Sequence, residues 1–115
     1  MKERRSGVSN KVTVFDFLKV ILPERERWRL EAMRIISETS GYITSYRISR
    51  KLGALGFDTR ANTIHPFLET LIEIGFCSRE ALLKERGHKE VEVTELGLLI
   101  MENLKSPLDI PRVDG

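Results

Sequence analysis

The stretch that decides the fold runs from Ala61 to Phe76 and reads ANTIHPFLETLIEIGF. Its apolar residues recur three and four positions apart, which predicts an amphipathic helix with one buried face. This helix starts near Thr59 or, as we prefer, after Asn62 as its cap. With Asn62 as the cap, Pro66 falls among the first four helical residues, whose N–H groups have no partner within the helix.

The residues before this stretch predict further helices. Apolar residues at helical spacing mark helices over 12–22 and 24–38, which Pro23 separates. Thr13, with Asp16 three positions later, is close to a capping box for the first of them. That helix is apolar on more than one side, which indicates burial on two faces, one of them against a second subunit.

A short strand and another helix connect this region to the quoted stretch. We expect Tyr42 and Ile43 to form a very short strand. Thr44 or Ser45 then caps a helix that extends to about Leu55, with its cationic side chains left outside. Two consecutive helices joined by a glycine-containing turn are typical of a DNA-reading pair.

Strand candidates at 76–83 and 90–93 follow, and the charged, glycine-containing turn between them predicts a hairpin. Thr94 with Gly97 opens a last helix. The sequence therefore predicts an α+β, mostly helical fold: a winged helix-turn-helix with a two- or three-stranded wing sheet and extra N- and C-terminal helices. The expected organisation is a flexible tail over 1–10, a DNA-binding domain over 11–106 with dimerisation helices at 12–22 and 94–106, and a C-terminal tail over 107–115.

The quoted stretch also resembles the recognition helix of PadR-like winged-helix regulators. The positions that fit the family's pattern are Thr63, Ile64, Pro66, Leu68, Leu71, Gly75 and Phe76. VEVTELG over 91–97 is similar to the family's junction between the wing and the next helix. GYI over 41–43, followed by ISRKL over 48–52, is similar to the start of its second helix.

The resemblance covers about residues 28–104 and implies a homodimeric transcriptional regulator that binds double-stranded DNA. His65 stands where the family usually has tyrosine. The family's long C-terminal dimerisation helix is missing or reduced to 94–106. A small archaeal or archaeal-virus winged-helix regulator fits the length and composition equally well.

Basic charge is concentrated in one part of the chain. The net charge of +2 is too small to indicate a nucleic-acid partner by itself. Between Tyr42 and His65, however, the sequence contains four basic residues and only one acidic residue, Asp58. These basic residues are Arg47, Arg50, Lys51 and Arg60.

We expect the helix over about 59–74 to enter the major groove, where arginine can pair with guanine and asparagine with adenine. Its candidate contacts are Thr59, Arg60, Asn62, Thr63 and His65, with capping as the alternative role of Asn62. The phosphate candidates are Ser45, Tyr46, Arg47, Arg50 and Lys51, with a core position as the alternative for Tyr46. The wing, about 84–90, offers Lys84, Arg86, His88 and Lys89 to the minor groove or backbone, and a solvated hairpin is the alternative because Glu85 and Glu90 flank them.

Enzyme and membrane functions find no support in the sequence. One cysteine, Cys77, and two distant histidines lack metal-ligand spacing, and neither a phosphate-binding glycine loop nor a nucleophile elbow is present. We therefore expect no cofactor and no metal. No apolar run approaches the roughly 18 residues of a membrane span, no secretory signal is apparent, and a lone cysteine agrees with a reducing cytoplasm.

Two other functions remain open at this stage: a winged helix that binds proteins, and a chromatin-type protein that binds DNA without sequence preference. A small-molecule effector is also open. Trp28 is expected in the core, and its alternative role is to line an effector pocket at a dimer interface.

Overall fold

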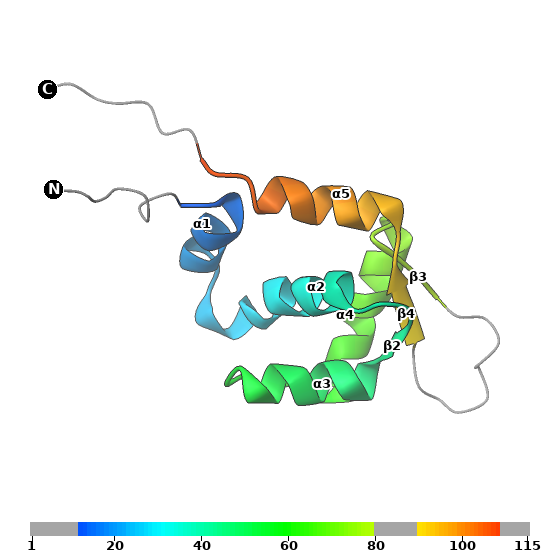
Figure 1. Ribbon diagram of the computed structural model, residues 1–115. Helices are drawn as coiled ribbons and strands as arrows, with labels where there is room; N and C mark the ends of the chain where they lie inside the picture. Colours follow the sequence, from blue (N-terminus) through cyan, green and yellow to red (C-terminus); the bar gives the residue numbers. More distant parts are fainter. Residues whose placement is uncertain (1–11, 80–89, 109–115) are drawn as a thin grey trace, which may run out of the picture.

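The computed structural model describes residues 12–79 and 90–108 (Figure 1). Over these residues the fold is α+β and mostly helical, with one small antiparallel sheet. The elements are α1 (Val14–Ile21), the 3-10 turn η2 (Glu24–Glu26), α2 (Trp28–Glu38), β2 (Ile43–Thr44), α3 (Ser45–Ala54), α4 (Ala61–Glu73), β3 (Cys77–Arg79), β4 (Glu90–Val93) and α5 (Glu95–Leu104).

The sheet joins segments that are far apart in the sequence. Its strand order is β2-β4-β3, so β4 lies in the middle and pairs antiparallel with both neighbours. Val91 stands opposite Ile43 on one side and opposite Arg79 on the other. The short strand expected at 42–43 lies one residue later, at Ile43–Thr44.

The core forms where α2, α3, α4 and the sheet meet. Each contributes apolar side chains with no exposed surface, because burying apolar area is the main favourable term in folding. These fully buried residues are Ala32, Ile36, Ile43, Ile48, Leu52, Ile64, Leu68, Phe76 and Val91. The helical spacing within 61–76 thus reports its buried face correctly.

Threonines start three of the helices, as the sequence predicted. Thr13 and Asp16 form a complete capping box at α1. The Oγ1 atoms of Thr44 and Thr94 accept hydrogen bonds from backbone N–H groups at the starts of α3 and α5, at 3.1 and 3.0 Å. Each such cap contributes about 1 kcal/mol.

The start expected for α4 is wrong. Asn62 is not the cap: the cap position is Arg60, whose backbone is extended and whose side chain makes no capping hydrogen bond. Asn62 instead lies in the first turn. Pro66 is consequently the sixth helical residue, where it removes the backbone hydrogen bond to the Asn62 carbonyl.

The two terminal helices lie close together, beside the visible ends of the described chain (Figure 1). Thr13 and Pro107 form an antiparallel bridge. The N–H of Val14 donates to the carbonyl of Ser106 at 3.1 Å, and that of Leu108 to the carbonyl of Val12 at 2.8 Å. Residues 107 and 108, assigned above to a tail, are therefore paired with the start of α1.

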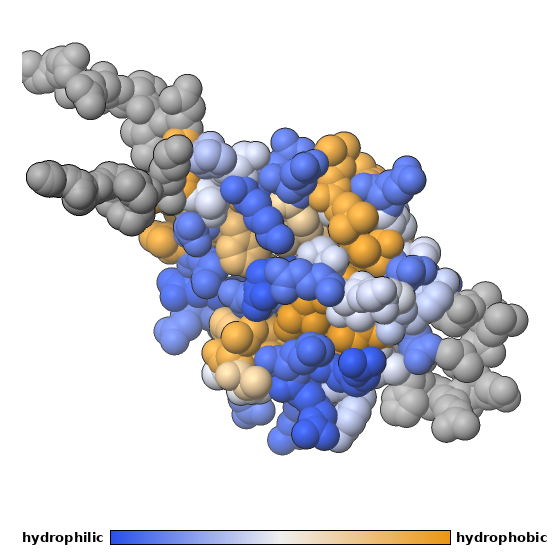
Figure 2. Space-filling view, in the orientation of Figure 1, coloured by the Kyte–Doolittle hydropathy of each residue, from blue (hydrophilic) through white to orange (hydrophobic). Residues whose placement is uncertain are grey.

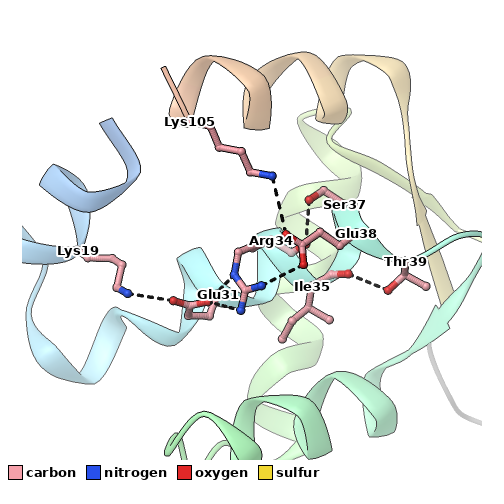
Figure 3. Close-up of polar contacts among 8 residues, drawn as sticks. All are labelled: Lys19, Glu31, Arg34, Ile35, Ser37, Glu38, Thr39 and Lys105. Atoms are coloured by element: carbon pink, nitrogen blue, oxygen red, sulfur yellow. Dashed lines mark hydrogen bonds and ion pairs between the residues drawn. The ribbon is translucent and has the colours of Figure 1, made fainter. Parts of the chain in front are cut away.

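A chain of ion pairs ties these helices to α2 (Figure 3). The buried Glu31 carboxylate contacts Lys19 of α1 at 3.1 Å and Arg34 at 2.7 Å. Arg34 also contacts Glu38 at 3.0 Å, and Glu38 lies 3.8 Å from Lys105 after α5. Burial opposes ionisation of Glu31, but hydrogen bonds from Arg34 and Lys19 outweigh it and lower the pKa of this carboxyl.

Candidate nucleic-acid interface

The outer side of α3 carries cationic side chains over a buried apolar side. Arg47, Arg50 and Lys51 are exposed, whereas Ile48 and Leu52 are fully buried. Figure 2 shows hydrophilic residues gathered over α3, at the lower edge of the molecule. This separation results from helical periodicity, which turns residues three and four apart to the same side.

Tyr46 lies on this outer side and is not a core residue. Its side chain is exposed, and Arg50 donates a hydrogen bond from Nη1 to the phenol oxygen at 3.4 Å. The Arg50 guanidinium also lies 5.8 Å from the centre of the Tyr46 ring, within cation–π range. Ring and guanidinium therefore form one amphipathic unit at the surface.

The start of α4 lies beside α3 and presents Arg60, Asn62 and Thr63 to solvent. Asn62 makes no hydrogen bond within the described residues, so its amide is not used for capping. Thr59, a predicted DNA contact, is instead buried, at 8% exposure. Its carbonyl accepts a hydrogen bond from Ser49 Oγ of α3 at 2.6 Å, which fixes the turn between the helices.

Ser45 is fully buried and is therefore not the surface phosphate contact that the sequence suggested. Its hydroxyl forms a hydrogen bond with His65 Nε2 across the α3–α4 contact, at 2.8 Å. His65 is half-buried. Both residues thus set how α4 sits against α3, a role that spacing along one helix does not reveal.

The hairpin candidates Lys84, Arg86, His88 and Lys89 lie outside the described residues. Only the strands on either side are described, namely β3 and β4. Glu90, within β4, is half-buried.

The structure adds a surface pocket that sequence reasoning missed. We call it the α2–α4 pocket; it measures about 510 Å³ and is lined mainly by Arg25, Glu26, Trp28, Arg29, Thr63 and Phe67. The Trp28 and Phe67 rings meet edge to face, with centroids 5.2 Å apart. The alternating acids and bases of 24–29 gave no sign of this pocket, because only the tertiary contact between α2 and α4 creates it.

Trp28 is 7% exposed and belongs to the core, as expected. Cys77 is also buried, and burial raises the pKa of its thiol to about 11. Among the residues that the structure describes, no three His, Cys, Asp or Glu side chains gather to hold a metal ion. No helix in the same parts of the chain has the length and apolarity needed to cross a bilayer.

No protein-family model, curated protein or solved structure matches this chain. Function is therefore inferred from the geometry described above.

Proposed function

We propose that this chain is a winged helix-turn-helix protein, similar to PadR-like regulators, that binds specific DNA sequences and regulates transcription as a homodimer. One observation carries the proposal: the exposed start of α4 lies beside the cationic outer side of α3. The element order and the β2-β4-β3 sheet support it, because they agree with a wing between β3 and β4.

In this proposal α4 enters the major groove and its first turn reads base edges. Arg60 suits guanine O6 and N7. The side-chain amide of Asn62, which caps no helix, suits adenine N6 and N7. Each good bidentate pair discriminates by about 1–3 kcal/mol. Arg47, Arg50 and Lys51 bind phosphates and fix the register without reading sequence. The hydrogen bond between Ser45 and His65 holds the reading helix at a constant angle.

A second copy of the chain is the proposed partner of α1. The buried side of α1 holds Phe15, while Phe17, Val20 and Ile21 remain 48%, 74% and 55% exposed. Covering these three side chains removes apolar surface that water otherwise contacts. Two copies joined in this way would present their reading helices to half-sites about 34 Å apart, one turn of DNA.

The test is selection of bound duplexes from a random pool, followed by sequencing of the enriched sites. We expect a pseudo-palindrome with half-sites about 10 base pairs apart. Arg60→Ala should relax preference at one position, whereas Arg50→Ala should weaken all duplexes alike. No enrichment with equal affinity for all duplexes would instead favour a chromatin-type role.

The exposed face of α1 also supports the second candidate, a winged helix that binds another protein. Sedimentation separates the two. A dimer that retains DNA at low salt supports the regulator, whereas a monomer that retains no DNA supports the protein-binding module.

A further inference from the structure

The α2–α4 pocket contains two cations with no part in the proposed base or phosphate contacts. Arg25 is exposed, and it makes no hydrogen bond or ion pair within the described residues. The Arg29 guanidinium lies 5.7 Å from the centre of the Trp28 ring and 5.8 Å from that of Phe67. Both rings therefore lie within cation–π range of Arg29.

The pocket opens along one flank of α4, the proposed reading helix. Pro66 and Thr70 extend its wall beyond Thr63 and Phe67. Thr63 belongs both to this wall and to the exposed first turn of α4, and its hydroxyl makes no hydrogen bond within the described residues. The pocket is thus continuous with the surface proposed to face DNA.

The α3 contact lies on the other flank of α4. Successive helical residues are about 100° apart, so Thr63 and His65 point about 160° away from each other. His65 points to Ser45 at the start of α3. Thr63 points to the side of Arg25 and Arg29. Cationic side chains therefore flank α4 on both sides, from α3 on one and from the segment before and within α2 on the other.

A helix about 10–12 Å wide fills a major groove about 12 Å wide, so the two sugar-phosphate backbones run along its two flanks. We propose that the α2–α4 pocket binds a backbone phosphate of the DNA strand opposite the one that α3 contacts, through Arg25, Arg29 and the Thr63 hydroxyl. Guanidinium and hydroxyl groups are common phosphate donors in protein–DNA complexes. This inference rests on the proposed function and adds a second backbone contact to it.

Glu26 makes the proposal testable in both directions. Its carboxylate lies in the pocket and contacts Arg29 at 3.3 Å. Arg29 and Glu26 are three positions apart and are partly exposed, so their ion pair contributes little and can exchange for a phosphate. The carboxylate also repels an incoming phosphate. Removing its charge should therefore tighten DNA binding, whereas removing either arginine should weaken it.

The experiment measures the affinity of the full chain for its selected duplex over a range of salt concentrations. The slope of log K against log salt is negative. For each chain in the complex, Arg25→Ala should make this slope shallower by about 1 and weaken binding about eightfold at 0.1 M salt. Base preference should not change. Arg29→Ala should act in the same direction, and Glu26→Gln should raise the affinity. Lys105→Ala, which removes an exposed charge after α5, should leave both quantities as they are.

Several results would overturn this inference while leaving the proposed function intact. One is a duplex that still depends on Arg50 and Arg60 but does not respond to Arg25→Ala. Another is a Glu26→Gln variant that weakens binding. A third combines two results. Inorganic phosphate, replacing chloride at equal ionic strength, produces a saturable change in the fluorescence of Trp28, the only tryptophan. In the same series, Arg25→Ala leaves DNA binding unchanged. That last pattern would assign the pocket to a free anion.

Discussion

Replacing Gly97 by alanine is the sharpest test of how α5 joins the rest of the fold. A Cβ atom at Gly97 would lie 2.1 Å from the carbonyl oxygen of Phe76 and 2.7 Å from Cγ2 of Val93. The first contact must lengthen by about 1 Å to become tolerable, and it involves backbone rather than the end of a flexible side chain.

The same carbonyl is held in place by Thr94. The Thr94 N–H donates to the Phe76 oxygen at 3.0 Å, and the Thr94 hydroxyl lies 3.1 Å from it. The single hydroxyl hydrogen is shared with the nearer Gly75 carbonyl oxygen, at 2.5 Å. Moving the Phe76 oxygen therefore strains the hydrogen bond from the Thr94 N–H and this shared one, and a full bond contributes about 0.5–1.5 kcal/mol. Overpacking destabilises the fold by about 1–3 kcal/mol more. Alanine offsets about 0.5–1 kcal/mol of the loss, because it lowers the conformational entropy of the unfolded chain. We expect a net loss of about 3 kcal/mol.

Thermal and urea unfolding followed by circular dichroism measures this loss. For a chain of 115 residues, about 3 kcal/mol corresponds to a fall in Tm of roughly 12 °C, because the unfolding entropy is about 2.1 cal/mol/K per residue. Gly53→Ala is the matched control, because a Cβ at this helical position in α3 meets nothing within 4 Å. It should stabilise the protein by about 0.5–1 kcal/mol. A Gly97→Ala variant within 0.5 kcal/mol of the parent, or a Gly53→Ala loss of equal size, would refute this account of the junction.

Three further predictions concern other contacts. Glu31→Gln should destabilise the protein at pH 7. The folded pKa of Glu31 is below its ordinary value of 4.5. The stability that the carboxylate contributes is therefore fully present above pH 4.5 and is lost as the pH falls through the folded pKa. Unfolding curves of both proteins should therefore converge in acid, and a constant difference would contradict this. Cys77 is buried and has a raised pKa, so at pH 8 a thiol reagent should label it only as fast as the chain opens; immediate native labelling would be the contrary result. Thr44→Ala removes the α3 cap and should cost about 1 kcal/mol in urea unfolding, whereas Thr44→Ser should retain most of it.

The parts of the fold that sequence predicted well depend on local chemistry. The Thr13–Asp16 capping box, the Thr44 and Thr94 caps and the buried spacing of α4 involve residues within one or two helical turns. Such contacts are specified by side chains close together in the chain. The start of α4 was the exception, because extended backbone at Arg60 began the helix before the better capping residue, Asn62.

The candidate site was harder to predict because its geometry depends on contacts between helices. Ser45 and Thr59 have polar side chains typical of a surface, yet the packing of α3 against α4 buries both. The exposed cations of α3 followed from periodicity alone. Arg25 and Arg29 precede the quoted stretch by more than 30 residues, and only the contact between Trp28 and Phe67 brings them beside α4.

The order of the strands has a consequence for synthesis of the chain on the ribosome. In sequence, β2 precedes α3 and β3 follows α4. Each of these two strands pairs with β4, which comes later in the chain. Val91 therefore lies opposite a residue of each outer strand, Ile43 in β2 and Arg79 in β3. A nascent polypeptide that has emerged only as far as Arg79 contains both helices and both outer strands but not β4. The three-stranded sheet can therefore form only after residues 90–93 have left the exit tunnel.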